Sequence, residues 1–336
     1  MEENLIFKSS LAGILKLFLQ NYKTTVSPTT YARKISHMHD FDEFLVKDGY
    51  KEGDPLNEPL LTRWLSTHKE LKNGSINFYS NSLRVFLRFY SEYNGKPGYL
   101  PPLYKEDDLY MPYLISDDEM ECIYNLVDNY NYGPNLASPF IQFEFPMVIR
   151  LLDSNGFRLN ELLTTKMTEI NLRDGVLKMV NTKNERQRLV PLTGSMTELL
   201  DTYCKAMGLY EGTEAYLFPK RTFSEPLINT DIANRFRKVL VKVGIRKGTE
   251  DFHARGACIH CLRHRFTLNS IKQLLQKGIT MEDVVPYLSI YLGHTSISET
   301  EKYMKFFADM FPEELDKFGE EATKLLPDES IWNDWM

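Results

Sequence analysis

Cysteine is scarce in this chain, with four among 336 residues, and no apolar run approaches the ~20 residues that a membrane-spanning helix needs. Four cysteines in a chain of this size do not form a disulfide framework, so we expect free thiols and a reducing compartment. The first residues carry acids ahead of their apolar stretch and lack the small-residue cleavage site of a secretion signal. These absences argue against a disulfide-rich secreted domain and against a membrane protein, and they predict a cytoplasmic location.

An excess of positive charge is also missing, because 46 acidic residues outnumber 40 Lys and Arg and give a net charge of −6. Proteins that bind nucleic-acid phosphates usually show the opposite balance. The segment from Asp309 to the end, however, holds nine acids against two lysines. The rest of the chain is close to neutral and can present basic faces, so the net charge does not exclude a nucleic-acid partner.

The first 95 residues contain four amphipathic segments with helical spacing, near Leu11–Leu19, Tyr31–Leu45, Leu60–Leu65 and Ile76–Tyr90. Ser27-Pro28 is a favourable start for the second segment, and Gly49 is a favourable end. We therefore predict a helical domain over residues 1–95.

Four prolines and two glycines lie between Asn94 and Pro112, and they disfavour both helix and sheet. We predict a linker over residues 96–113, a second domain over 114–308 and a C-terminal tail over 309–336. Ser116 begins a predicted helix in the second domain. Alternating apolar residues around turns at Asp174-Gly175 and Lys183-Asn184 predict a three-stranded antiparallel sheet within it. The predicted fold class is mainly α with a small antiparallel β-sheet, in two domains.

Four short motifs in the second domain carry potential chemistry. In chain order they are Gly156-Phe157-Arg158-Leu159-Asn160-Glu161-Leu162, the hairpin residue Lys183, His260-Cys261-Leu262-Arg263-His264, and Leu292-Gly293-His294 followed nine residues later by Tyr303. Each motif alone is weak evidence, because arginine, histidine and tyrosine are common residues. Their order and spacing together are far more specific.

This ordered set resembles the tyrosine recombinase (phage integrase) family, from about Leu114 to Tyr303. The residues 27–45 also resemble the family's core-site-binding segment, and the phrase Pro286-Tyr287-Leu288-Ser289-Ile290-Tyr291 favours members carried by transposons or integrative elements. The resemblance implies a helical core-site DNA-binding domain followed by an α+β catalytic domain. It also implies an enzyme that cleaves and rejoins DNA strands through a 3′-phosphotyrosyl intermediate and exchanges strands between duplexes.

Each catalytic residue type suits that chemistry. The guanidinium groups of Arg158 and Arg263 are shaped to bind the non-bridging oxygens of a phosphodiester under attack. Tyr303 is the predicted nucleophile and His260 its base, because a phenol with a pKa near ~10 needs help at neutral pH. By the resemblance, Lys183 protonates the leaving 5′ oxygen and His294 donates a further hydrogen bond to the phosphate.

Supporting roles are predicted for Glu161, which pairs with Arg158, and for His264, which is expected to be mainly structural. Cys258 and Cys261 with their interleaved histidines form a C-x-x-C pattern, but no second ligand pair has finger-like spacing, so we predict no metal and assign both cysteines to packing. No nucleotide or other cofactor is predicted.

Clusters of cations are the candidate DNA-backbone contacts, with a solvated surface as the alternative. In the second domain they are Arg235, Arg237, Lys238, Lys242, Arg246 and Lys247. In the first domain they are Arg33, Lys34, Arg84 and Arg88. The tail contains eight large apolar residues, so we expect it to dock, and its predicted site is a neighbouring protomer.

The predicted partners are double-stranded DNA with specific core sites and further copies of this chain, as a tetramer on two duplexes. One alternative is a type IB topoisomerase, which shares this chemistry without exchanging partners. Another is a catalytically idle DNA-binding accessory protein. The spacing from Leu292-Gly293-His294 to Tyr303 and the helical first domain argue against the topoisomerase, and the intact six-residue set argues against the idle protein.

Overall fold

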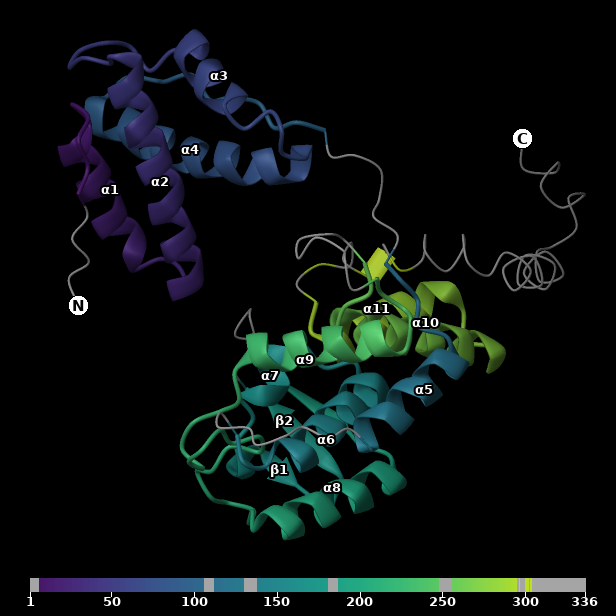
Figure 1. The fold of residues 1–336 in the computed structure, drawn as a ribbon. Helices are drawn as coiled ribbons and strands as arrows, with labels where there is room; N and C mark the ends of the chain where they lie inside the picture. Colours follow the sequence, from purple (N-terminus) through teal and green to yellow (C-terminus); the bar gives the residue numbers. More distant parts are fainter. Residues whose placement is uncertain are drawn as a thin grey trace, which may run out of the picture. The chain divides into compact units, whose positions relative to one another are not determined.

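The computed structural model describes residues 6–105, 112–129, 138–180, 187–247, 256–294, 296, 300, 301 and 303. The chain divides into two compact units, residues 1–110 and residues 111–336. Most of the regular structure is helical, and a small antiparallel sheet lies in the second unit (Figure 1). The predicted fold class is confirmed. Among the described residues, no helix combines the length and the apolar character needed to cross a membrane.

The first unit contains the four predicted helices, α1 (Ala12–Lys23), α2 (Pro28–Asp48), α3 (Glu58–Ser66) and α4 (Asn73–Asn94). Helix α2 begins where Ser27 accepts a hydrogen bond from the Thr30 backbone N–H, with Pro28 in the first turn. It ends at Gly49, whose φ of 74° is a left-handed conformation that glycine adopts without strain. The local cap signals thus set both helix ends.

Aromatic side chains form the centre of this unit. Phe18, Phe41, Trp64 and Phe86 come from all four helices and are almost completely buried. Their rings contact one another edge-on, with centroids 5.0 Å apart for Phe41 and Trp64. Burying each of these side chains contributes about 1.5–3 kcal/mol. The apolar faces of the four predicted helices therefore form the core of this unit.

Part of the predicted linker lies against α4. The side chain of Asn77 forms two hydrogen bonds with the backbone of Tyr104, and Arg84 donates to the carbonyl oxygen of Pro101. Tyr99 and Leu100 also pack on the core of the first unit. The proline-rich stretch up to residue 105 is therefore held by side chains of α4.

The second unit has a helical body and one sheet. The helices are α5 (Asp117–Asp128), α6 (Ile141–Asn155), α7 (Leu159–Leu163), α8 (Gly194–Met207), α9 (Asn229–Lys242), α10 (His260–Gln276) and α11 (Met281–Leu292). A 3-10 turn, Met167–Glu169, precedes strands β1 (Ile170–Asn171), β2 (Val176–Met179) and β3 (Arg188–Pro191). The strands pair antiparallel in the order β1-β2-β3, which confirms the predicted sheet.

Helix α6 lies in the middle of the second unit, where it contacts α5, α8 and α10 (Figure 1). It is buried on nearly every side, through residues such as Phe145, Val148, Ile149 and Leu152. Helix α5 starts with the reciprocal hydrogen bonds of a capping box between Ser116 and Glu119. The rigid end of α6 leads directly into the first chemical motif.

Candidate active site

Glu161 is shared by two arginines. Its Oε1 accepts a hydrogen bond from Nη1 of Arg158 at 2.7 Å, and its Oε2 accepts one from Nη2 of Arg188 at 2.8 Å. The Glu161 side chain is 3% exposed, and those of Arg158 and Arg188 are 20% and 8% exposed. Burial acts to raise the pKa of Glu161, but the charges and hydrogen bonds of both arginines outweigh it and lower the pKa. The carboxylate therefore stays ionised and fixes both guanidinium groups.

Arg263 lies in the first turn of α10 and is 2% exposed. Its Nη1 donates to the carbonyl oxygen of Gly156 at 2.7 Å, and its Nη2 donates to that of Leu292 at 2.9 Å. These carbonyls stand at the C-terminal ends of α6 and α11, where the helix dipole favours a cation. Burial and then the charge of Arg158 lower the pKa of Arg263 to about 10, so it remains protonated at neutral pH.

Two glycines end these helices in the left-handed region, with φ of 61° at Gly156 and 65° at Gly293. A Cβ at Gly156 would lie 2.3 Å from the ring of Phe266, and one at Gly293 would lie 2.9 Å from Nη1 of Arg188. Nη2 of Arg158 donates to the carbonyl oxygen of Gly293 at 3.1 Å. Glycine is thus required at both positions for its conformation and for its small size.

His294 is buried between Arg263 and Thr300. Its Nε2 lies 3.0 Å from Nη2 of Arg263, and its Nδ1 lies 2.7 Å from Oγ1 of Thr300. Arginine can only donate, so Nε2 accepts that hydrogen bond. In a neutral ring the proton is then on Nδ1, which donates to Thr300.

Tyr303 lies beside this group and is 6% exposed. Its hydroxyl oxygen is 2.9 Å from Nδ1 of His264, and its ring is nearly parallel to that of His294, with centroids 6.3 Å apart. Burial raises the pKa of Tyr303, and the nearby charge of Arg263 opposes that rise. The phenol is therefore protonated at neutral pH.

The two histidines of the H-x-L-R-H motif have different surroundings on α10. His264, expected to be mainly structural, contacts the phenol, and burial lowers its pKa to about 3. His260, the predicted base, lies one turn earlier on α10, with its ring edge-on to that of His264 at 4.6 Å. Desolvation by surrounding protein atoms, followed by the charges of Arg263 and Arg158, lowers the pKa of His260 to about 4, although the residue is exposed. Both rings are neutral at pH 7.

The sequence predicts eight residues for catalysis and support, and the structure brings six of them together. These six are Arg158, Glu161, Arg263, His264, His294 and Tyr303. The structure also places His260 next to His264. Lys183 lies in residues 181–186, outside the described residues. Sequence reasoning missed Arg188 and Thr300. Strand periodicity could have pointed to Arg188. Arg188 and the buried Val190 are two residues apart in β3, so they face the same side of the sheet, and a cation on that side needs a partner.

The predicted DNA-contacting cations differ in their surroundings. Lys238, Lys242, Lys247, Arg33 and Arg88 are exposed, and Arg235 and Arg237 are half-buried.

Three others are held by the protein itself. Lys34 is buried with its ammonium group 5.0 Å from the ring centre of Tyr22. Arg84 donates to Pro101, and the buried Arg246 donates to the carbonyl oxygen of Ala257 at 3.0 Å. These three cations have structural partners that sequence reasoning did not foresee.

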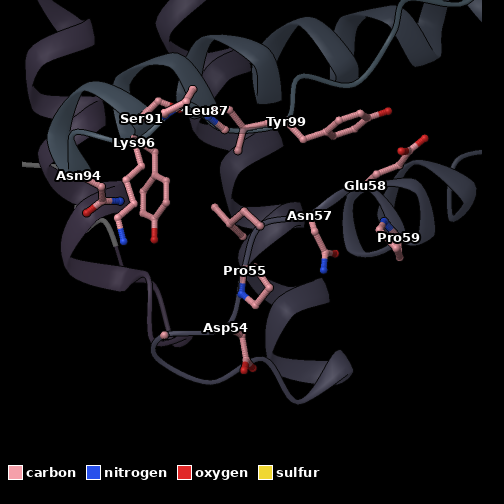
Figure 2. A pocket seen from close by; sticks show the side chains of 15 residues that line it. Asp54, Pro55, Asn57, Glu58, Pro59, Leu87, Ser91, Asn94, Lys96 and Tyr99 are labelled. Atoms are coloured by element: carbon pink, nitrogen blue, oxygen red, sulfur yellow. Dashed lines mark hydrogen bonds between the residues drawn. The ribbon is translucent and has the colours of Figure 1, made fainter.

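A separate pocket of about 710 Å³ lies in the first unit, between the segment 53–59 and the end of α4. Figure 2 shows Asn94 and Lys96 on one side of this pocket and Pro55 and Asn57 across from them. None of the predicted catalytic residues that the structure describes lines it. Within the part of the chain that the structure describes, no group of three or more His, Cys, Asp or Glu side chains is placed to hold a metal ion.

Residues 116–309 match the family model described as the phage integrase family, which covers more than half of the chain. The chain belongs to this family.

Curated relatives agree with this assignment. The chain is 31% identical over 157 residues to the putative integrase/recombinase y4rB of Sinorhizobium fredii, a match that covers 46% of this chain and 49% of that protein. It is 25% identical to the tyrosine recombinase XerD of Staphylococcus saprophyticus, over 88% of this chain and 87% of that one. The chain thus spans about half the length of the first of these relatives.

Solved structures share the fold. The XerH site-specific recombinase bound to a palindromic difH substrate has a TM-score of 0.64 and 19% identity, covering 84% of this chain and 78% of that chain. The Tn1549 transposon integrase in complex with transposon right end DNA has a TM-score of 0.63 and 15% identity, covering 92% and 98%. This member of the phage integrase family therefore shares its fold with both of these solved structures.

Proposed function

We propose that this protein is a site-specific DNA recombinase that cleaves and rejoins strands with Tyr303 as its nucleophile. One observation carries the proposal: the hydroxyl of Tyr303 lies 2.9 Å from Nδ1 of His264, and the charges of Arg263 and Arg158 act on this phenol. A phosphodiester under attack gains negative charge on its non-bridging oxygens, which two guanidinium groups stabilise. The proximity of these side chains to one another supports Tyr303 as the nucleophile, and no single one of them would do so alone.

The proposed reaction begins when the phenolic oxygen of Tyr303 attacks the scissile phosphorus and forms an O–P bond. The bond from phosphorus to the deoxyribose 5′ oxygen breaks, and that oxygen takes a proton from Lys183. Arg158 and Arg263 hold the non-bridging oxygens. The energy of the broken bond is retained in the phosphotyrosine, so a 5′ hydroxyl of a second strand can reverse the step without a nucleotide cofactor.

The phenolic proton passes to a histidine. In the described arrangement His264 contacts the hydroxyl, but Tyr303 is only 6% exposed there. The segment that carries Tyr303 has to move before its oxygen can reach a phosphate, and His260 is the more open of the two rings. We therefore propose that His264 holds the resting phenol and that His260 accepts the proton during attack.

The partners in this proposal are duplex DNA with specific core sites and further copies of the chain, assembled as a tetramer on two duplexes in the cytoplasm. Strand exchange requires two cleaved duplexes at once, because each free 5′ hydroxyl must attack a phosphotyrosine of the other duplex. The exposed cations of α9 are the proposed backbone contacts. The C-terminal tail, which lies outside the described residues, is the proposed link between protomers.

A suicide DNA substrate, nicked beside the cleavage site, tests the nucleophile. The protein is incubated with this DNA in EDTA, and a denaturing gel separates covalent protein–DNA adducts. We expect an adduct with the wild type and with Tyr287→Phe, an exposed tyrosine of α11, and none with Tyr303→Phe. An adduct that persists in Tyr303→Phe would place the nucleophile elsewhere. Binding to DNA without any adduct from the wild type would favour the idle accessory protein, and relaxation of supercoiled DNA without strand exchange would favour the topoisomerase.

The same substrate separates the two histidines. We expect His260→Gln to lower the rate of adduct formation by about 10²–10⁴-fold, the usual contribution of general base catalysis. His264→Gln should change that rate much less, because glutamine can still hydrogen-bond the resting phenol. The opposite ranking of the two variants would assign the base to His264.

A further inference from the structure

Two cysteines flank the predicted base at the start of α10. The Sγ atoms of Cys258 and Cys261 are 4.0 Å apart, and the backbone N–H of Cys258 points at Sγ of Cys261 with a separation of 3.4 Å. The backbone N–H of Cys261 donates to the carbonyl oxygen of Cys258 at 2.9 Å, which closes the turn between them. Cys258 is exposed and Cys261 is buried. Since a disulfide requires an S–S distance of about 2.05 Å, the sulfurs need to approach by only about 2 Å.

The surroundings make the two thiols unequal. A hydrogen bond from the thiol of Cys261 lowers the pKa of Cys258 to about 6, although desolvation by neighbouring protein atoms opposes this. Backbone N–H groups at the helix start and the charge of Arg246 act in the same direction. The pKa of Cys261 is raised by the same hydrogen bond and by burial. At neutral pH the outer sulfur is mainly a thiolate and the inner one a thiol, which is the arrangement of an attacking and a resolving cysteine.

We propose that Cys258 and Cys261 form a reversible thiol–disulfide pair that responds to hydroperoxides and controls the site on α10. With hydrogen peroxide, the Cys258 thiolate attacks one peroxide oxygen, the O–O bond breaks, and the products are a sulfenic acid and, after protonation, water. The Cys261 sulfur then attacks the Cys258 sulfur, the S–O bond breaks, and a second water leaves with the thiol proton. Two thiols are oxidised and one hydroperoxide is reduced, and a dithiol reductant restores the pair.

The control follows from the position of His260 between the two cysteines. Drawing the sulfurs together shifts the backbone of residues 258–261, and the His260 ring packs on His264, which contacts Tyr303. This consequence rests on the proposed function. Displacing a catalytic group by about 1 Å costs about 10²-fold in rate, so we expect the disulfide form to make covalent DNA adducts about 10- to 100-fold more slowly than the dithiol form.

A peptide mass measurement tests the chemistry without DNA. The full chain is treated with hydrogen peroxide, free thiols are alkylated, and trypsin releases the peptide between Arg255 and Arg263, which contains both cysteines. We expect this peptide to escape alkylation and to lose two hydrogens, and to regain two alkylation sites after dithiothreitol. Cys122, which is also exposed, is the internal control and should not form an intrachain disulfide. Recovery of the peptide with both thiols intact, or with only higher oxides of Cys258, would overturn the proposal.

Adduct formation on the suicide substrate then tests whether the disulfide regulates the site. Peroxide should lower the rate at which the wild type forms adducts, and dithiothreitol should restore that rate. The variant Cys258→Ser should form adducts at the same rate with and without peroxide. Cys258 is exposed, so this variant is expected to fold, and Cys261→Ala provides a second variant that cannot form the disulfide. A disulfide that forms without slowing adduct formation would overturn the proposed regulation of the site. If the wild type makes no adduct at all but forms the disulfide, the proposed function has failed while the thiol pair stands.

Discussion

At the scale of single residues, the candidate site depends on one buried carboxylate. Glu161 accepts hydrogen bonds from Arg158 and Arg188, and Arg158 in turn donates to the carbonyl oxygen of Gly293. The ion pairs cost desolvation, so their value lies in orientation more than in stability. Removing one member leaves a buried charge with less compensation, which makes these residues sensitive to substitution.

Arg188→Ala should therefore destabilise the protein by about 3–5 kcal/mol, the cost of breaking a buried ion pair by deleting one partner. Arg63→Ala is the matched control, because the pair of Arg63 with Asp48 is exposed and such pairs are worth about 0–1 kcal/mol. Urea unfolding followed by circular dichroism measures both. Equal losses in the two variants would mean that Arg188 does not depend on the buried carboxylate.

The neutral histidines make stability depend on pH. Burial holds the pKa of His264 at about 3 against an ordinary 6.5, so unfolding lets this ring bind a proton between those values. The unfolded chain binds more protons there, and the free energy of unfolding should fall as the pH drops below 6.5, by up to about 1.4 kcal/mol per unit for this one group. Above pH 6.5 the contribution of His264 is constant.

Unfolding measured from pH 7.5 to 4.5 checks this expectation. His264→Gln should have a shallower loss of stability in acid than the wild type, and His39→Gln, which alters a ring stacked on Phe7 in the first unit, should have the wild-type slope. An unchanged slope in His264→Gln would show that His264 does not titrate as its burial implies.

At the scale of secondary structure, the site is assembled where helices α6 and α11 end. Both helices end at a left-handed glycine, and carbonyl oxygens at the two ends accept hydrogen bonds from the same guanidinium group of Arg263. Helix α10 supplies that arginine together with both histidines. The ends of α6 and α11 and the start of α10 therefore meet at one cation, which His294 also contacts just after α11.

Gly156→Ala should destabilise the second unit more than Gly208→Ala does. Both glycines end a helix with positive φ, where a side chain costs about 1–2 kcal/mol, but only at Gly156 would the new carbon meet another ring, that of Phe266. Overpacking adds about 1–3 kcal/mol, because a shift of the Phe266 ring away from the new carbon would disturb its stacking on Tyr291. Thermal unfolding of the two variants measures their losses of stability. Similar losses in both would mean that the Phe266 ring moves away from the new carbon at little cost.

At the scale of the whole molecule, charge is unevenly distributed along the chain. The acids concentrated after residue 308 account for the negative net charge, and exposed lysines lie on α9. Proteins that neutralise DNA phosphates release counterions, and their affinity falls steeply with salt. The overall acidity is therefore compatible with a DNA-binding surface on the second unit.

The double variant Lys238→Gln, Lys242→Gln should weaken DNA binding and reduce the salt dependence of the association constant by about one unit of slope per lost phosphate contact. Lys16→Gln, an exposed lysine of α1, is the control and should leave the slope unchanged. Fluorescence anisotropy with labelled duplex at several salt concentrations measures both. A slope that is the same in the double variant and the wild type would remove α9 from the DNA interface.

The sequence by itself determined the helices with strong end signals and the identity of the chemical residues. Ser27-Pro28 and Gly49 set the ends of α2, and Ser116 starts α5, because capping hydrogen bonds and left-handed glycines act within a few residues. The motifs around Arg158, Arg263 and His294 likewise identified the candidate residues, through their resemblance to a family to which the chain belongs.

Only the tertiary structure decided which partner each of these side chains has. Arg188 and Glu161 are 27 residues apart and Tyr303 and His264 are 39 apart, so their contacts arise from packing of distant elements and leave no local pattern. The same holds for Arg84 and Arg246, predicted at the DNA surface and found bonded to the protein's own carbonyl oxygens. Residue type fixes what a side chain can bind, but the fold decides how much water surrounds it, and burial is the main reason that the ring of His264 is neutral and the phenol of Tyr303 is protonated.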